Sequence, residues 1–336
     1  MDKPLFIINI VLFVVTFWGV MRYNLHMFQL NGYKNKEHFR WLIKNIRHSL
    51  ILLPILVPAV LIALGLKLYL AIIMYVVYGV LAAYFIRQRF INTKKKLVFT
   101  NRVKRLVFTN VLIQVIAVTL GSIFLGRWVY LLTAVLIVIV PWMMILVNII
   151  NSPVEKGINQ GYISDAKRIL GKMPNLKIIG ITGSYGKTSV KYYLQTLLKS
   201  KYNVLVTPAS YNTPMGVVRT IREELKPIHQ IFVCEMGARN IGDIKELCDI
   251  VHPHYGVITS VGPQHLETFL NIQNITNTKF ELADAIPDDG MIFLNGDNEY
   301  IIGNSNKYFN KIFYATEEKK RSYYSASFTS TTLFPL

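Results

Sequence analysis

The chain contains few cysteines and few charged residues. Of its 336 residues only Cys234 and Cys248 are cysteine, which excludes a disulfide framework, and no Cys/His spacing indicates a zinc site. Free cysteine is usually a small buried residue, so we expect both to lie reduced in a core. Charged residues make up 17% of the chain and hydrophobic ones 52%. This balance excludes a disordered protein and indicates that part of the chain lies in lipid.

Acidic residues are scarce in the first half of the chain. Residues 1–150 hold 17 Lys/Arg against only Asp2 and Glu37, a net charge of +15, whereas residues 151–336 hold 20 against 17, a net of +3. The basic excess therefore belongs to the apolar half, where it is typical of membrane topology, and we expect no nucleic-acid partner. No apolar run contains an acidic residue, which disfavours an ion-coupled transporter.

Four apolar runs occupy most of residues 1–150. They are residues 5–20, 49–86, 106–125 and 128–150. The second run has 38 residues and would rise about 57 Å as one helix, nearly twice a hydrocarbon core of about 30 Å. It must therefore fold back, with Gly65-Leu66-Lys67 as the natural turn. The sequence thus predicts a membrane region, residues 1–150, of about five transmembrane helices.

Lysine and arginine are unevenly distributed between the predicted loops. Fourteen lie in the two long loops between spans one and two and between spans three and four, and 2, Lys67 and Arg127, lie in the opposite turns. This bias predicts a multi-pass protein of a bacterial-type cell membrane, with the lipid bilayer as partner and everything after Ile150 in the cytoplasm. Asn110 and Gln114 lie one helical turn apart in the fourth span. We favour interhelical hydrogen bonds for them over a transport pathway.

The second half of the chain has the pattern of an α/β domain. Residues 151–176 are expected to form a polar helical connector, and Pro174-Asn175 is expected to end its helix. Beyond it, short apolar runs alternate with amphipathic stretches, which indicates βαβ units. Strands are expected at residues 177–181, 204–207, 231–235, 255–259 and 291–294. The domain is expected to span residues 177–318, and residues 319–336 to form an irregular tail at a truncated end.

The first expected strand runs directly into a glycine-rich loop. The loop reads Thr182-Gly183-Ser184-Tyr185-Gly186-Lys187-Thr188-Ser189. Its glycines let backbone amides surround phosphate oxygens, and the helix that follows directs its positive end at the same charge. Lys187 would contact the β- and γ-phosphates of ATP, and the Thr188 hydroxyl would hold Mg²⁺. The usual spacing has a further glycine where Ile181 stands, but a strand before the loop and a helix after it make the match specific.

The helix after the loop has its own signal, an apolar stripe of Val190, Leu194, Leu197 and Leu198. The predicted fold class is therefore an α-helical membrane region followed by an α/β P-loop domain with a mainly parallel sheet.

Five further segments support a specific resemblance. They are Ser210-Tyr211-Asn212-Thr213-Pro214-Met215-Gly216, Cys234-Glu235-Met236-Gly237-Ala238, Gln264-His265-Leu266-Glu267, Thr278-Lys279-Phe280-Glu281 and Leu294-Asn295-Gly296-Asp297. Together with the glycine-rich loop, they resemble in order the motifs of the central ATP-binding domain of the Mur ligase family. These ATP-dependent enzymes add amino acids or dipeptides to the peptidoglycan precursor. The resemblance covers residues 177–315.

The resemblance implies a role for each matching residue. In the family, metal ligands and a lysine carbamate surround the phosphates, so two Mg²⁺ are expected beside ATP. The implied metal ligands are Thr188, Glu235, His265 and carbamylated Lys279, and the implied catalytic residues are Lys187, His265 and Lys279. Asn295 and Asp297 would flank the nucleotide base and ribose, and Asn212 and Thr213 would bind substrate.

The implied reaction is amide formation through an acyl phosphate. ATP phosphorylates a carboxylate of a muropeptide or similar acceptor, and the amine of an amino acid or dipeptide attacks it. In the family a UDP-sugar-binding domain precedes the central domain and a further domain follows it. Here the membrane region takes the first place, so the acceptor could be lipid-linked, and a partner chain could supply the further domain. The alternatives are a non-catalytic nucleotide-binding membrane protein and a ligase-like subunit of an amidating or polyglutamate-type complex. The shortened chain could also be inactive.

Overall fold

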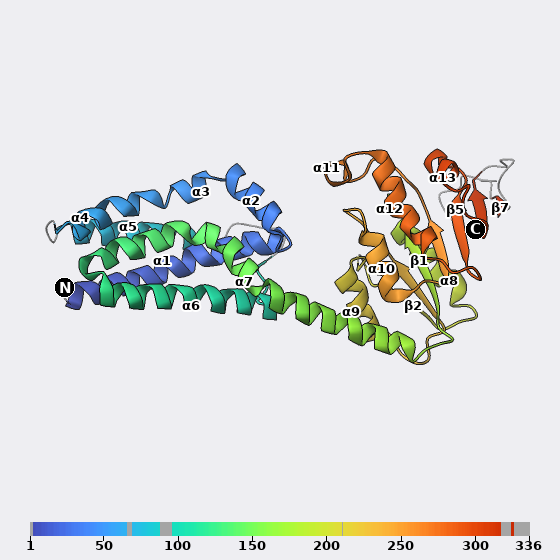
Figure 1. Ribbon diagram of the computed structural model, residues 1–336, viewed down its shortest axis with the longest axis horizontal. Helices are drawn as coiled ribbons and strands as arrows, with labels where there is room; N and C mark the ends of the chain where they lie inside the picture. Colours follow the sequence, from blue (N-terminus) through green and yellow to red (C-terminus); the bar gives the residue numbers. More distant parts are fainter. Residues whose placement is uncertain (1–2, 66–68, 88–95, 210, 317–323, 326–336) are drawn as a thin grey trace, which may run out of the picture. The chain divides into compact units, whose positions relative to one another are not determined.

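The chain forms two compact units, Met1–Gly157 and Ile158–Leu336. The computed structural model describes residues 3–65, 69–87, 96–209, 211–316 and 324–325. The first unit is helical, and the second combines helices with a sheet (Figure 1). One helix, α7 (Val129–Gly171), is continuous across the boundary between the units. It contains residues 151–171 of the expected connector, which is helical there as predicted, and the helix ends before the last residues of that connector.

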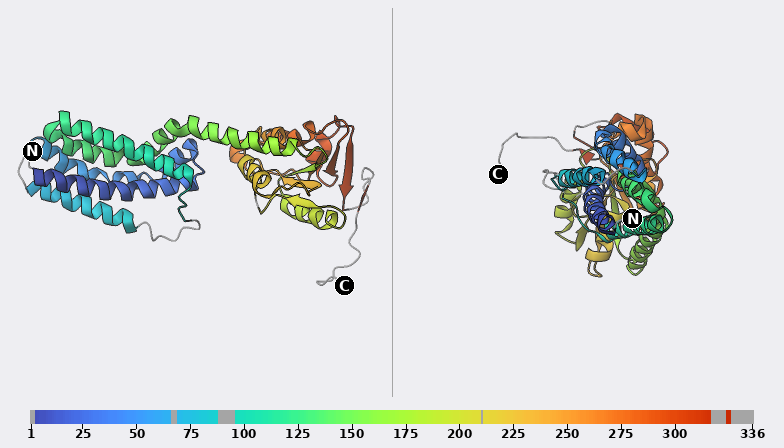
Figure 2. Two further views of the ribbon diagram at one scale, coloured as in Figure 1. Left: turned by 90° about the horizontal axis from the view of Figure 1, so that it is seen from below. Right: turned by 90° about the vertical axis from the view of Figure 1, so that its left-hand side faces the viewer.

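Most helices of the first unit follow the apolar runs of the sequence, and the long ones run alongside one another (Figure 2). They are α1 (Lys3–Leu30), α2 (Asn35–Lys44), α3 (Arg47–Leu50), η1 (Leu53–Ile55), α4 (Leu56–Ala63), α5 (Tyr69–Arg87), α6 (Asn101–Phe124), η3 (Gly126–Trp128) and the start of α7. The long second run folds back as predicted, because α4 packs against α5. Gly65 has a φ of 90°, a conformation that favours glycine. Leu66 and Lys67 of the expected turn lie outside the described residues.

Three of the described helices are long and apolar enough to cross a membrane. They are Phe6–Leu30, Asn101–Phe124 and Gly126–Gly171. The pair Asn35–Lys44 and Arg47–Ala63, bent by 73°, adds a fourth if it forms one span, and Ile72–Phe85 is a shorter apolar helix. These assignments rest on length and composition alone, so the predicted five spans stay a prediction.

The buried polar pair on α6 differs from expectation. Gln114 donates to the Met143 sulfur at 3.3 Å across to α7, which is the predicted kind of interhelical contact. Asn110 is fully buried, yet neither its amide nitrogen nor its carbonyl oxygen has a hydrogen-bond partner among the described residues. The prediction of an interhelical hydrogen bond is therefore wrong for Asn110.

The second unit contains a parallel sheet with the strand order β2-β3-β1-β4-β5-β6-β7. The strands are β1 (Lys177–Thr182), β2 (Val204–Val206), β3 (Ile231–Glu235), β4 (Tyr255–Ile258), β5 (Met291–Asn295), β6 (Lys311–Ala315) and β7 (Tyr324–Ser325). All five predicted strands are confirmed to within a residue. β1 lies between β3 and β4, so the strand order reverses beside it. In open α/β sheets this switch point is where ligands bind, at the carboxyl ends of the strands.

The last strands extend the sheet beyond the prediction. β6 was not expected, and β7 pairs with it in parallel, Tyr314 opposite Tyr324. The expectation of an irregular tail is therefore wrong at Tyr324–Ser325, because backbone pairing at a sheet edge needs no apolar periodicity. Residues 317–323 and 326–336 of the expected tail lie outside the described residues.

Helices cover both faces of the sheet. They are α8 (Lys187–Leu198), α9 (Pro214–Glu224), α10 (Asp243–Val251), α11 (Leu266–Phe269), α12 (Ile272–Asp284) and α13 (Glu299–Asn304). Side chains along β3 alternate between the two cores: Ile231 and Val233 face one, and Phe232 and Cys234 face the other. A parallel sheet buried on both faces therefore explains the uninterrupted apolar strand sequences.

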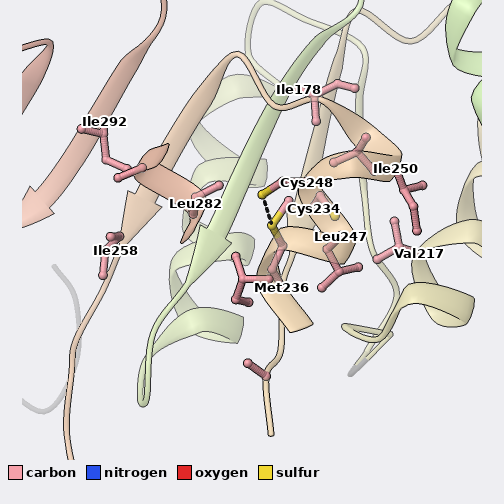
Figure 3. Packing of buried hydrophobic residues seen from close by; sticks show 14 of the residues in the cluster. Ile178, Val217, Cys234, Met236, Leu247, Cys248, Ile250, Ile258, Leu282 and Ile292 are labelled. Atoms are coloured by element: carbon pink, nitrogen blue, oxygen red, sulfur yellow. Dashed lines mark hydrogen bonds between the residues drawn. The ribbon is translucent and has the colours of Figure 1, made fainter. Parts of the chain in front are cut away.

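The core on the α10 side contains both cysteines, free and buried as predicted. Figure 3 shows Cys234 and Met236, at the end of β3, packed beside Leu247 and Cys248 of α10. Burial raises the pKa of the Cys248 thiol to about 12, so it stays protonated at neutral pH. On the other face, Val190, Leu194 and Leu198 of α8 pack on the sheet. The predicted apolar stripe is wrong at Leu197, which is 69% exposed because it lies to one side of the packed face.

Candidate active site

The glycine-rich loop joins β1 to α8 in a conformation that requires glycine. Gly183 has a φ of 151° and Gly186 a φ of 79°, and both values favour a residue without a Cβ. A Cβ on Gly183 would also lie 2.1 Å from the Thr259 hydroxyl oxygen, far inside contact distance. The loop can therefore lie directly against the end of β4 only with glycine at this position.

The segment after β4 holds the loop in place. The Ser184 amide donates to the Ser260 carbonyl at 2.8 Å, and the Tyr185 amide to the Ser260 hydroxyl at 2.8 Å. The Ser184 hydroxyl donates to the Gly262 carbonyl at 3.0 Å. These bonds orient the first part of the loop toward β4. The amides left for an anion are those of the first turn of α8, which have no acceptor within a helix.

Lys187, the first residue of α8, lies across the loop. Its ammonium donates to the Gly183 carbonyl at 2.6 Å and to the Ser184 carbonyl at 3.4 Å. Burial lowers the pKa of Lys187, and the Glu235 carboxylate opposes this effect. These two bonds hold the ammonium group against the backbone of the glycine-rich loop. A phosphate bound by this loop would have its charge neutralised there.

Glu235, at the carboxyl end of β3, is the centre of a buried polar cluster. It is 2% exposed. Its Oε2 accepts from the Thr188 hydroxyl at 3.0 Å and from the Lys191 ammonium at 2.9 Å, and its Oε1 accepts from the Asn212 amide at 3.0 Å. Two predicted metal ligands, Thr188 and Glu235, are therefore in direct contact. Both offer oxygen atoms, which are the ligands that Mg²⁺ prefers.

Sequence reasoning missed Lys191. This residue is fully buried in α8, forms the ion pair with Glu235, and also donates to the Ala209 carbonyl at 2.6 Å. The signal was its position four residues after Lys187, which places both lysines on one face of the helix. Composition alone treats a helix lysine as a surface residue.

Asn212 and Thr213, predicted to bind substrate, have structural partners here. The Asn212 carbonyl accepts from the Gly237 amide at 2.8 Å, and a Cβ on Gly237 would lie 2.8 Å from the Asn212 side chain. Thr213 is the N-cap of α9 and accepts from the Gly216 amide. Asn212 thus belongs to the Glu235 cluster, and the substrate roles stay predictions.

His265 and Lys279 come from elements that follow β4. His265 has a φ of 57° and precedes α11, and its pKa is lowered by burial and by the charges of Arg239, Lys279 and Lys187. Lys279 lies on α12 and is only 3% exposed, and burial with the nearby Lys187 charge lowers its pKa to about 8. Electrostatic coupling of both residues to Lys187 indicates that they share its surroundings. Their roles as metal ligands and catalytic residues stay predictions.

Asn295 and Asp297, expected beside the nucleotide base and ribose, follow β5. The Asn295 amide donates to the Thr259 carbonyl at 2.9 Å, which joins the ends of β5 and β4. The Asp297 carboxylate accepts from the amide and hydroxyl of Thr316, both at 2.8 Å. Both residues therefore lie at the carboxyl edge of the sheet, but their nucleotide contacts stay predictions.

The described residues contain no group of three or more His, Cys, Asp and Glu side chains that could hold a metal ion. A metal here would rely on Thr188 and Glu235, supplemented by phosphate oxygens and water, which is the usual coordination of Mg²⁺. The oxygen donors fit one Mg²⁺. The second ion and its ligands Glu235, His265 and Lys279 stay a prediction.

A cavity of about 710 Å³ lies elsewhere, at the amino-terminal ends of the strands, with Lys177, Ile231 and Tyr255 in its lining. It contains none of the predicted site residues. The candidate site is therefore defined by the glycine-rich loop and the strand ends on the opposite edge of the sheet.

Comparisons with known proteins show what the second unit is similar to. Residues 181–334 match the Mur ligase middle domain. This match agrees with the resemblance that the motifs predicted, and the matched segment extends past the predicted end at residue 318.

Several curated relatives are UDP-N-acetylmuramoyl-tripeptide–D-alanyl-D-alanine ligases. The one from Mycobacterium tuberculosis (strain ATCC 25618 / H37Rv) is 38% identical over 123 residues, 37% of this chain and 24% of the relative. That of Synechocystis sp. (strain ATCC 27184 / PCC 6803 / Kazusa) is 36% identical over 134 residues, 40% of this chain and 29% of the relative. The crystal structure of the MurF ligase from Thermotoga maritima in complex with ADP is 33% identical and covers 47% of this chain and 37% of that chain, with a TM-score of 0.45. The chain spans about a quarter of the length of the curated relatives it matches.

Proposed function

We propose that this protein is a membrane-anchored, ATP-dependent amide ligase of the Mur type that acts on a muropeptide. The observation that carries the proposal is the contact of Thr188 with Glu235, directly behind the loop that Lys187 crosses, within a Mur ligase middle domain. The sequence similarity to D-alanyl-D-alanine ligases supports a dipeptide as the incoming amine.

The reaction needs alignment and charge neutralisation more than covalent help from the protein. Lys187 and the first amides of α8 bind the phosphates and neutralise charge as the γ-phosphoryl group moves to the acceptor carboxylate. The new bond joins the carboxylate oxygen to phosphorus, and the bond to ADP breaks. The amine then attacks the acyl carbon, and phosphate leaves as the amide forms.

Thr188 and Glu235 would hold Mg²⁺, which supplies further charge neutralisation at the phosphates when bound. His265 suits a ligand role because its lowered pKa keeps the imidazole neutral at pH 7. Lys279 suits carbamate formation, which requires a neutral amine, because its pKa is lowered to about 8. A carbamate there would turn a cation into an anionic oxygen ligand of a second Mg²⁺.

The proposed location is a bacterial cell membrane with the ATP-binding domain in the cytoplasm. The three apolar helices long enough to cross a membrane support this location. An acceptor presented on a lipid carrier suits an enzyme anchored in this way, and a partner chain that contributes to the reaction is a further part of the proposal.

The experiment measures ADP release by the purified full chain in lipid nanodiscs, with Lys187→Ala as the inactive control. UDP-muramoyl tripeptide and its lipid-linked counterpart are compared, each with D-alanyl-D-alanine and Mg²⁺, and hydroxylamine traps acyl phosphate. The account expects ADP release and a trapped hydroxamate that depend on the muropeptide. ATP binding with no ADP release for either acceptor, also after addition of a cell extract as the source of a partner, would favour a non-catalytic nucleotide-binding protein.

A further inference from the structure

Lys191 has no place in the proposed chemistry, yet it is the most deeply buried charge in the site. Its side chain is 0% exposed, and its two hydrogen bonds, to Glu235 and to the Ala209 carbonyl, lie within the protein. A buried lysine costs free energy unless it is paired. Its partner Glu235 is the residue proposed to hold Mg²⁺, so the pair bears directly on the metal.

The hydrogen bonds occupy most of the acceptor positions of the Glu235 carboxylate. A carboxylate has about four acceptor positions, and Thr188, Lys191 and Asn212 take three of them, two on Oε2 and one on Oε1. The open position is on Oε1. A cation can therefore reach Glu235 from one direction only.

The charges of the cluster are unusual for a metal site. Lys187 and Lys191 contribute two positive charges beside the single negative charge of Glu235. The Lys191 charge lies 2.9 Å from Oε2, so it repels any cation that binds to the same carboxylate. The cluster therefore disfavours a divalent cation that binds without a nucleotide, and it favours an anion such as a nucleoside triphosphate.

We propose that Lys191 is a positioning residue that makes metal binding depend on the nucleotide. Its charge neutralises Glu235 and suppresses binding of free divalent cations, and the phosphates of the nucleotide supply the negative charge that admits the metal. Its bond to Ala209 also fixes the start of the segment that carries Asn212. The inference rests on the proposed role of Glu235 as a metal ligand.

The test measures binding of free Mn²⁺, as a paramagnetic substitute for Mg²⁺, to the nucleotide-free full chain in nanodiscs. Lys191→Gln removes the charge but keeps an amide donor for Glu235, and Lys191→Arg keeps the charge. The proposal expects Lys191→Gln to bind free Mn²⁺ at least about tenfold more tightly than the wild type because the repulsion is removed. Lys191→Arg should match the wild type.

Two further variants separate the proposal from a folding defect. Lys191→Gln combined with Glu235→Gln should lose the added Mn²⁺ binding, because the carboxylate is gone and no buried charge is left unpaired. Thermal unfolding identifies which variants are folded, and Lys191→Met replaces Lys191→Gln if the latter is not. Equal or weaker Mn²⁺ binding by a folded, charge-deleted variant overturns the proposal. The readout needs no turnover, so it is independent of whether the protein proves to be a ligase.

Discussion

Lys279 shows how burial prepares a single side chain for chemistry. At 3% exposure its charged form is disfavoured, and the Lys187 charge acts in the same direction, so its pKa falls to about 8. At pH 7 about one in ten of such amines is neutral, against about one in 3,000 for an ordinary lysine. Only the neutral amine adds carbon dioxide. The surroundings of Lys279 thus favour the neutral amine that the proposed carbamate requires.

We predict that Lys279→Ala abolishes phosphoryl transfer and leaves ATP binding unchanged. Added bicarbonate should stimulate the wild type, and the activity should rise as the pH increases from 7 to 9, because the neutral amine becomes the main form above about pH 8. The measurement is ADP release with the muropeptide acceptor. The control is Lys245→Ala, since Lys245 is 69% exposed and pairs with Asp249 on the surface of α10. Full turnover by Lys279→Ala would remove the catalytic role of this residue.

At the scale of secondary-structure elements, the site depends on close packing of the glycine-rich loop against the end of β4. The contact of Gly183 with Thr259 leaves no space for a Cβ, and hydrogen bonds from Ser184 and Tyr185 to Ser260 hold the two segments together. The position of α8, and with it that of Lys187, follows from this packing.

We predict that Gly183→Ala lowers the free energy of unfolding of the domain by about 1–3 kcal/mol, because the added methyl group overlaps the Thr259 hydroxyl. ATP binding should be lost together with it. The matched control is Gly161→Ala in α7, where no atom lies within 4 Å of the added Cβ. It should stabilise the helix by about 0.5–1 kcal/mol. Chemical denaturation of both variants makes the comparison, and an unchanged stability of Gly183→Ala would contradict the packing argument.

The elements of the α/β domain were largely predictable, because each strand of a doubly covered parallel sheet is a short apolar run between turns. The glycine-rich loop was predictable because its sequence encodes its conformation. β6 was missed although its sequence, Lys311 to Ala315, is mainly apolar. Lys191 was missed because its partner Glu235 lies 44 residues away in the sequence, so its spacing from Lys187 did not by itself reveal the ion pair.

At the scale of the whole molecule, the unequal charge of the two halves and the continuous helix α7 are the main features. The helix that contains the last apolar run, α7, continues without a break into the second unit, where its Ala166 is fully buried in the core. The positive-inside bias predicts that this unit lies in the cytoplasm. This orientation stays a prediction, and it depends on loop composition and not on packing. Of the loop lysines and arginines on which this prediction depends, four lie outside the described residues: Lys67, Arg89, Lys94 and Lys95.

We predict that an impermeant maleimide labels Arg127→Cys but not Lys96→Cys in intact cells. Arg127 belongs to a predicted outer turn and Lys96 to a predicted cytoplasmic loop. The native cysteines give little background, since both are buried and the pKa of Cys248 is raised to about 12, so its thiol stays protonated during labelling near pH 7. Permeabilised cells provide the control in which both variants react. Labelling of Lys96→Cys in intact cells would reverse the assigned topology.

The measurement that tests the central claim most directly is the affinity of the purified full chain for Mg²⁺-ATP, compared with that of Lys187→Ala. A charge-assisted contact with phosphate contributes about 1.5–3 kcal/mol, so the variant should bind about 10- to 150-fold more weakly. Lys199→Ala, which changes an exposed lysine at the other end of α8, should bind as the wild type does. Equal ATP affinities for the wild type and Lys187→Ala would contradict the assignment of a nucleotide site to this loop, and with it the ligase.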